Sequence, residues 1–413
     1  MQIYLYNLEK YVEKGDFMNF IFVSPAFPTN YHNFCSRLKR NGVNVLGIGD
    51  TPYHELRDEV KNSLTEYYKV NNLENFDEMC GAVSYFQYKY GKIDFLESNN
   101  EYWLRQDSRL RETFDIFGPK PWDVDAFTTK SRMKDYYIAA GVPVARYAHC
   151  VNFEEDVKFA HMVGYPIIVK PNVGVGAAAT YKLHNDKELQ EFHYYGFPVP
   201  YIMEEFIEGN ITSLDGVCDS NSNILFADNG VFPPSIMDIV NKNLEVEFYI
   251  NKETPSDIYE IGQRVLKAFN IKSRFFHLEF FRLTKRKEGL GEVGDIVALE
   301  VNMRPPGGVA PDMINYSQSV DTYQIYADMI CYDKIVNVYL NHEKFYCCNV
   351  ARRDRFNYVY SEWDIKNKYD WNICQMGRTS EVLSAAMANF YFIAKFQTLD
   401  EVNNFIADVL KKW

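Results

Sequence analysis

The sequence of 413 residues predicts an α/β protein of two or three domains, the first built on a doubly wound parallel sheet. Strand and helix signals alternate from about residue 19 onward, which is the pattern of parallel strands joined by crossover helices. The chain is too long for one ordinary hydrophobic core. Hydrophobic residues make up 47% and aromatic residues 16% of it, so packed interiors are expected and disorder is not.

The first expected strand is the buried run 20–24 (FIFVS), and the next helix ends at Asn41-Gly42. In this region strands are expected at 20–24, 43–47, 67–70 and 93–97, and helices at 31–40 and 76–90. The turn after the first strand, 24–28, reads SPAFP and lacks the G-x-G-x-x-G pattern. A dinucleotide site of the Rossmann kind, and with it a nicotinamide dehydrogenase, is therefore not supported.

A domain boundary is expected at 117–121 (FGPKP), because two prolines and a glycine interrupt regular structure there. A helix is expected after it at 130–140. Further strands are expected at 166–170, 179–183, 201–205, 214–218, 275–283 and 296–301. After about residue 333 the chain is strand-rich and aromatic and ends in a helix at 399–412, which predicts a small closing domain.

The formal net charge of −12 argues against a nucleic acid partner. The eight cysteines form no C-x-x-C pair, so neither a metal cluster nor a disulfide framework is expected. Residues 1–16 lack the apolar core of a signal peptide, and no apolar run reaches the roughly 18–20 residues of a membrane helix. The expectation is a cytoplasmic protein with no membrane partner.

A lysine followed by small residues is the first chemical signal. Lys170 closes the strand run 166–170 (PIIVK), and the loop after it contains Gly174 and Gly176. Small side chains let backbone N–H groups approach phosphate oxygens, so this is a phosphate clamp in outline, although not a Walker A loop. Alone, the pattern fits equally a glycine-containing hairpin beside an exposed lysine.

Polar residues interrupt two apolar strand runs. Alternation places His277 and Glu279 on one face of the first run, and Glu300 and Asn302 on one face of the second. If the strands are neighbours, the two carboxylates and the amide oxygen converge as magnesium ligands. The alternative is a sheet face open to solvent. His277 is either a site residue in the same cleft or a satisfied core histidine.

Arg304 precedes the rigid and then flexible sequence Pro-Pro-Gly-Gly of 305–308. A guanidinium held at a strand end could stabilise a transferring phosphoryl group or a tetrahedral oxyanion, with the Gly307 N–H as a second donor. The plainer alternative is an arginine that pairs with a nearby acid before a turn.

Five stretches taken in order resemble the ATP-grasp superfamily, and more closely its carboxylate–amine ligases and biotin-carboxylase-like members. They are Thr129–Lys134 (TKSRMK), Ile168–Pro171 (IVKP), Met203–Gly209 (MEEFIEG), His277–Phe281 (HLEFF) and Glu300–Gly308 (EVNMRPPGG). The likeness covers about residues 19–330. It implies an N-terminal α/β domain at 1–120, a central α+β ATP-grasp domain at 121–333 with a mobile lid subdomain at about 141–203, and a small C-terminal α+β domain at 334–413.

The resemblance also implies roles for the matching residues. The residues implied to bind ATP are Lys130, Lys170, Gly174, Gly176, Glu204, Glu205, Ile207 and Glu208. The implied ligands of two Mg²⁺ ions, with Mn²⁺ as an alternative, are Glu279, Glu300 and Asn302. Arg304 and the Gly307 amide are implied to steady the reacting groups.

Two departures from the family pattern bear on activity. The loop continues as Ala177-Ala178-Ala179 where a serine and a further glycine are common. After Gly209, Asn210-Ile211 stands where an acid often holds the ribose, so Glu208 is the candidate substitute.

The function implied is an ATP- and Mg²⁺-dependent carboxylate–amine ligase that forms an acyl phosphate and releases ADP and phosphate. The alternatives are an ATP-dependent carboxylase acting on bicarbonate and an ATP-binding protein with weakened catalysis. The small-molecule carboxylate and amine substrates stay open, as does the oligomeric state, although homodimers are common among similar ligases. Residues 229–239 are a candidate pocket wall. Arg352, Arg353 and Arg355 either reach a substrate carboxylate or form a solvated basic turn.

Overall fold

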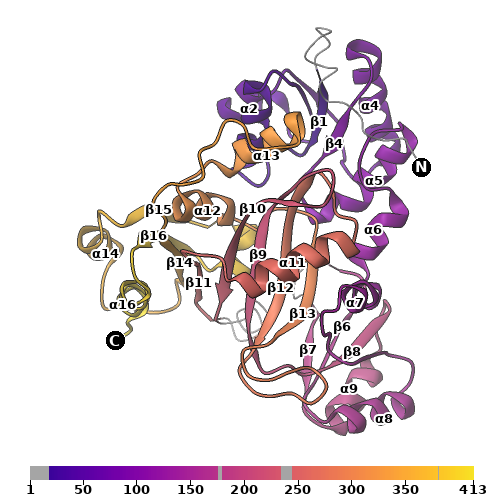
Figure 1. Ribbon diagram of the computed structural model, residues 1–413, viewed down its shortest axis with the longest axis vertical. Helices are drawn as coiled ribbons and strands as arrows, with labels where there is room; N and C mark the ends of the chain where they lie inside the picture. The colour runs from indigo at the N-terminus through magenta and orange to yellow at the C-terminus, as the bar shows by residue number, and fades with distance from the viewer. Residues whose placement is uncertain (1–17, 175–178, 234–243, 380) are drawn as a thin grey trace.

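The computed structural model describes residues 18–174, 179–233, 244–379 and 381–413, which form three sheets with helices packed around them (Figure 1). Gly176, which the sequence assigns to the phosphate loop, lies outside these ranges, as does much of the candidate wall at 229–239.

The N-terminal sheet is parallel and has the order β3-β2-β1-β4, as predicted. Its strands are β1 (Asn19–Val23), β2 (Asn44–Gly49), β3 (Glu66–Lys69) and β4 (Phe95–Glu97). The helices of this region are α2 (His32–Arg40), α3 (Asp58–Ser63), α4 (Phe76–Tyr90) and α5 (Leu104–Thr113). All five residues of β1 are buried, because the sheet packs against apolar side chains on both faces.

A second sheet of eight strands crosses the centre of the molecule in the order β13-β12-β9-β10-β11-β14-β16-β15. Its first five strands are β9 (Gly209–Cys218), β10 (Ile224–Phe232), β11 (Val246–Ile250), β12 (Arg274–Leu283) and β13 (Ile296–Asn302). Helix α11 (Ser256–Ala268) covers one face (Figure 1). The packing is close, since a Cβ atom on Gly262 would come within 2.1 Å of the Leu214 side chain.

The last three strands of this sheet come from the region predicted to be a small closing domain. They are β14 (Tyr346–Arg352), β15 (Ile373–Arg378) and β16 (Phe390–Phe396), and β14 pairs directly with β11. The helices of this half are α12 (Ala310–Gln318), α13 (Thr322–Tyr332), α14 (Glu362–Lys368), α15 (Glu381–Met387) and α16 (Leu399–Leu410). The closing region therefore extends the central sheet.

A third sheet, of order β5-β8-β6-β7, occupies the region assigned to the lid. Its strands are β5 (Tyr147–His149), β6 (Ile167–Pro171), β7 (Tyr181–Leu183) and β8 (Tyr201–Glu205). Helices α8 (Phe153–Val163) and α9 (Asp186–Tyr195) pack on it, and α6 (Pro121–Thr128) and α7 (Lys130–Ala139) precede it. Among the described residues, no helix is long and apolar enough to cross a lipid bilayer.

A buried ion cluster joins the parallel sheet to the central one. Glu97 at the end of β4 lies 2.7 Å from the Arg111 guanidinium and 3.1 Å from that of Arg274 on β12. Arg274 also donates to the Met303 carbonyl, the residue before Arg304. One carboxylate thus balances two buried cations and fixes the interface next to a candidate site residue.

Replacing Glu97 by Gln is expected to lower the free energy of unfolding by about 3–5 kcal/mol, because two buried guanidinium groups lose their counter-ion. Urea unfolding followed by circular dichroism measures the change. The matched control is Glu155→Gln, which breaks the exposed pair with Lys158 and should cost less than about 1 kcal/mol. Equal, small effects of both substitutions would contradict the assignment.

Candidate active site

The carboxylates of β12 and β13 lie side by side because the two strands pair. His277 faces Asn302 and Glu279 faces Glu300 across the antiparallel ladder, so all four share one face of the sheet. A register irregularity follows Glu279, where Phe280 faces Ala298. The strand neighbourhood that the magnesium prediction required is present.

The environments of the two carboxylates differ. Burial alone would raise the pKa of Glu279, but His277, Arg304 and Lys170 outweigh it and lower that pKa. For Glu300 burial prevails and raises the pKa, although Lys130 opposes it. Glu279 therefore already has nearby cations, whereas Glu300 lacks enough positive charge in the protein alone. A bound cation would supply it.

His277 connects Glu279 to a deeper pair of acids. Its Nδ1 is hydrogen bonded to Asp215 on β9, and its Nε2 lies 3.4 Å from a Glu279 oxygen. Burial alone would lower the pKa of His277, but Asp215 and Glu279 raise it to about 10. Asp228 faces Asp215 from β10, is fully buried, and has a pKa raised well above its usual range by burial and by Asp215. His277 is thus buried, with an acid near each of its ring nitrogens.

Lys130 reaches both the glycine loop and the metal-ligand candidates. Its Nζ donates to the Gly174 carbonyl at 3.0 Å and lies 3.3 Å from a Glu300 oxygen. The helix start is fixed beside the loop, since the Lys130 N–H donates to the carbonyl of Asn172 and the Ser131 N–H donates to the Asn172 side chain. Lys130 and Glu300, which are 170 positions apart in the sequence, thus lie in one cluster.

Lys170 pairs with Glu204, and so does a lysine to which the sequence motifs assign no role. Lys170 lies 2.8 Å from one Glu204 oxygen, and Lys134 lies 2.8 Å from the other. Burial alone would raise the pKa of Glu204, but the two lysines lower it to about 2. The signal available in the sequence was the spacing of Lys134 four residues after Lys130, which places both on one helix face.

Side chains at the end of β8 and just after it differ in their exposure to solvent. The Glu205 side chain is buried and accepts from the Arg146 backbone and guanidinium, with Lys287 3.3 Å away. Ile207 packs in an apolar cluster with Leu283 and others. Glu208 is exposed and pairs with Lys285. The side chains of Glu205 and Ile207 are thus engaged within the protein, and the Glu205 N–H donates to the Arg146 carbonyl.

Arg304 is held by an acid from the N-terminal domain. Its Nε and Nη2 donate to one oxygen of Glu101 at 3.2 and 3.1 Å. Arg304 therefore pairs with an acid, as the plainer alternative required. Its charge also lowers the pKa of Glu279. Glu101 could not be predicted as the partner of Arg304, because the two residues lie about 200 positions apart in the sequence. Beyond Gly307, the backbone at Gly308 lies against Met387 of α15.

The alternative of a solvated basic turn was wrong for Arg352 and Arg353. Arg352 is buried and donates to the carbonyls of Val409 and Tyr360. Arg353 is buried and donates to the carbonyls of Leu244, Ser384 and Ala385, so it anchors α15. Arg355 is exposed and lies over the Phe356 ring.

The donor set fits magnesium with a polyphosphate better than a metal held by protein alone. Within the described ranges, no group of three or more His, Cys, Asp and Glu side chains could hold a metal ion. Two carboxylates and an amide, with positions left for phosphate and water, are typical of Mg²⁺ bound with a nucleotide. The ammonium groups of Lys130 and Lys170 lie close to these donors and could supply the positive charge that a polyphosphate requires.

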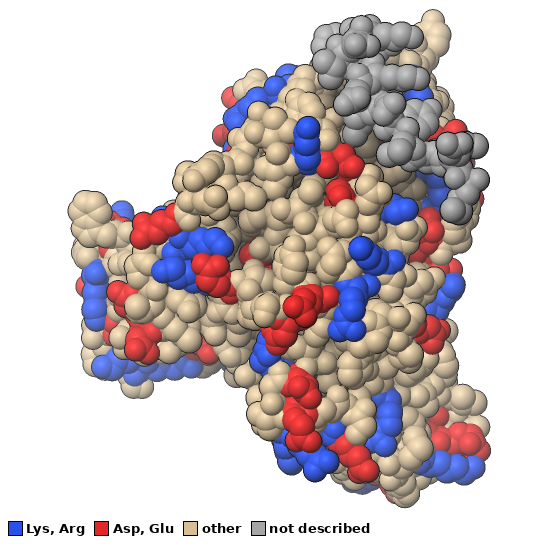
Figure 2. All heavy atoms as spheres, in the orientation of Figure 1, with Lys and Arg blue, Asp and Glu red and all other residues tan. Residues whose placement is uncertain are grey.

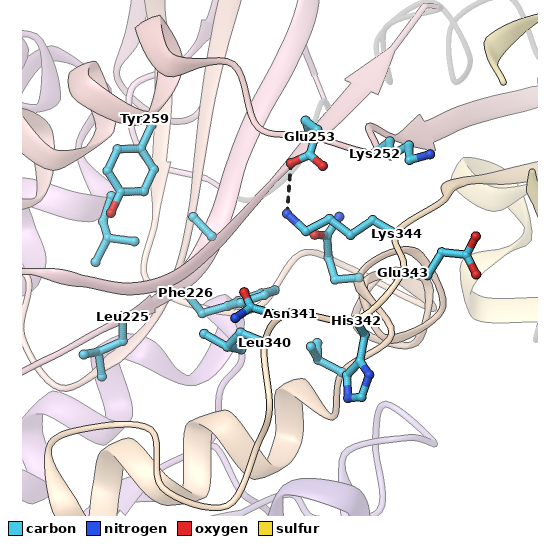
Figure 3. Close-up of a pocket in the computed structure, with 14 residues that line it drawn as sticks. Leu225, Phe226, Lys252, Glu253, Tyr259, Leu340, Asn341, His342, Glu343 and Lys344 are labelled. Atoms are coloured by element: carbon cyan, nitrogen blue, oxygen red, sulfur yellow. Dashed lines mark hydrogen bonds and ion pairs between the residues drawn. The ribbon is translucent and has the colours of Figure 1, made fainter. Parts of the chain in front are cut away.

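A separate hollow of about 600 Å³ lies between the start of β10 and residues 340–344 (Figure 3). None of the predicted site residues lines it, and two of its charged groups pair with each other, Lys344 lying 2.9 Å from Glu253. The face of the molecule seen in Figure 2 mixes both signs of charge, with no broad basic area. The convergence of lysines and acids described above is therefore the candidate active site.

Comparison with known proteins bears on this assignment. Residues 129–199 match the family model of the carbamoyl-phosphate synthase L chain, ATP binding domain. An L-arginine-specific L-amino acid ligase of Bacillus subtilis is 26% identical over 246 residues, which is 57% of each chain. The chain thus spans a little over half the length of this curated relative.

Solved structures share the fold over nearly the whole chain. The L-amino acid ligase from Bacillus licheniformis superposes with a TM-score of 0.70 at 13% identity, covering 95% of this chain and 96% of the ligase. The biotin carboxylase domain of 2-oxoglutarate carboxylase from Hydrogenobacter thermophilus, in complex with MgADP, has a TM-score of 0.65 at 16% identity, covering 96% and 90%. The chain therefore shares its fold with these enzymes, and its residues 129–199 are similar in sequence to an ATP-binding domain.

Proposed function

We propose that the protein is an ATP- and Mg²⁺-dependent carboxylate–amine ligase that forms an amide or peptide-like bond through an acyl phosphate. The observation that carries the proposal is the meeting of Lys130 with both the glycine loop and Glu300, beside the paired strands that present Glu279 and Asn302. Phosphate-binding and metal-binding groups thus share one site.

The chain's own residues divide the work of binding. Lys130 and Lys170 neutralise the phosphates, and the backbone of the loop at Gly174 lies alongside them. Glu279, Glu300 and Asn302 hold Mg²⁺, with two ions or Mn²⁺ as finer possibilities for the same donors. Bound magnesium would neutralise phosphate charge. Glu204 and the backbone of Glu205 and Ile207 hold the adenine, and Glu208 is proposed for the ribose.

The reaction needs positioning and charge neutralisation and no side-chain nucleophile. A substrate carboxylate oxygen attacks the γ-phosphorus of ATP, the bond to the bridging oxygen breaks, and ADP leaves. An amine then attacks the acyl carbon, loses a proton, and displaces phosphate. Arg304, held by Glu101, and the Gly307 N–H stabilise the charge that develops on the reacting oxygens.

Amino acids are the proposed substrate class. Two relatives described as L-amino acid ligases support it, one by sequence and one by fold over nearly the full chain. A homodimer is proposed because a solved biotin carboxylase of this fold is described as a dimer. That neighbour's complex with bicarbonate is the reason to keep an ATP-dependent carboxylase as the second candidate.

Purified protein supplied with ATP, Mg²⁺ and a pool of amino acids is expected to release ADP and phosphate. Glu300→Gln should reduce the rate at least about 100-fold, since it removes a charged magnesium ligand at the point where phosphate charge develops. A coupled ADP assay measures the loss. The control Glu292→Gln changes an exposed acid paired with Arg286 and should leave the rate unchanged. Full activity of Glu300→Gln would sink the assignment.

Isotope transfer separates the ligase from the carboxylase. With an amino acid labelled with ¹⁸O in its carboxylate, one label should appear in the released phosphate, because that oxygen bridges carbon and phosphorus in the acyl phosphate. Mass spectrometry of the phosphate detects it. ADP release that depends on bicarbonate, with label arriving only from bicarbonate, would instead support the carboxylase.

A further inference from the structure

Lys134 is the one member of the lysine cluster that neither the motifs nor the proposed reaction uses. It lies one helical turn after Lys130 on α7, and its ammonium group ends 2.8 Å from Glu204 on β8. Its side chain is 6% exposed and that of Glu204 is 8% exposed. An ion pair so deeply buried is seldom incidental, since removing two charges from water is costly.

The cluster contains more positive charge than the carboxylate can balance. Lys134 takes one oxygen of Glu204 and Lys170 takes the other, so one carboxylate compensates two ammonium groups. Burial lowers the pKa of Lys134, and the neighbouring Lys170 lowers it further, against the attraction of Glu204. The surplus charge favours an anion close to this cluster.

Lys134 and Lys170 differ in the groups that lie within reach of their ammonium ions. Lys170 is followed by the loop that carries Gly174, and its charge is felt by Glu279 and Glu300 on the metal side of the site. Lys134 sits within a helix, beside the Tyr147 ring at 5.3 Å, and its ion pair is with Glu204. Lys170 can therefore turn toward phosphates while Lys134 stays.

We propose that Lys134 is a positioning residue. It fixes the Glu204 carboxylate for the adenine amino group and remains its counter-ion when Lys170 turns to the phosphates of ATP. Without Lys134, Lys170 would have to stay on Glu204 or leave a buried carboxylate unpaired. The inference rests on the proposed ATP-binding function of this site.

If the role of Lys134 were purely structural, its substitution would have a different effect. If Lys134 only held α7 against β8, its loss would lower thermal stability and leave nucleotide affinity and base preference unchanged. A positioning residue affects both, because guanine presents a carbonyl oxygen where adenine presents an amino group. A displaced Glu204 loses its ability to tell them apart.

The test compares Lys134→Met, Lys134→Gln and Lys134→Arg with Arg132→Met, which removes an exposed charge from the same helix. Titration with AMP-PNP and GMP-PNP in the presence of Mg²⁺ measures affinity without requiring turnover. Lys134→Met and Lys134→Gln should weaken AMP-PNP binding about tenfold and shrink the preference for it over GMP-PNP several-fold. Lys134→Arg should retain most of both, and Arg132→Met should match the wild type.

The outcomes separate the two proposals. Folded Lys134→Met or Lys134→Gln protein with wild-type affinity and base preference, whatever its melting temperature, overturns the role of Lys134 alone. If Lys134→Met does not fold, the Gln and Arg variants decide. Wild-type protein that fails to bind AMP-PNP with Mg²⁺ overturns the proposed function, and the role of Lys134 with it.

Discussion

The antiparallel register of β9, β12 and β13 is the constraint on which the site depends. It aligns Asn302, His277 and Asp215 in one row and Glu300, Glu279 and Ser213 in the next. A shift by one residue would turn each of these side chains to the opposite face, where α11 packs against Leu214 and Leu278. The apolar residues that fill that face therefore also determine where the charges stand.

Several buried charged side chains in this protein each interact with two oppositely charged partners rather than one. Glu97 serves Arg111 and Arg274, Glu204 serves two lysines, and His277 lies between two carboxylates. Sharing leaves a residual charge in each cluster. Around Glu97 the leftover positive charge belongs to the packing between two sheets, whereas near Glu204 it favours the anionic ligand that is proposed above.

Local patterns predicted the elements whose periodicity is strong. Helix 76–90 and strand 201–205 have the expected bounds, and the residues of β12 and β13 face as alternation requires. Contacts between distant segments could not be read in this way. Glu101 meets Arg304 only because two domains pack together, and Arg353 turns inward because the carbonyls of α15 lie nearby. Such partners depend on tertiary packing, which no spacing in the chain records.

The pairing of β14 with β11 joins the closing region to the sheet that presents the carboxylates. Because the eight strands are hydrogen bonded in one sheet, the closing region and the strands of Glu279 and Glu300 share a continuous backbone ladder. Arg353 on the segment after β14 holds α15 through the Ser384 and Ala385 carbonyls, and Met387 of α15 lies against Gly308, four residues after Arg304. Exchanging the last eighty or so residues for those of a relative would therefore also change the packing beside the proposed active site.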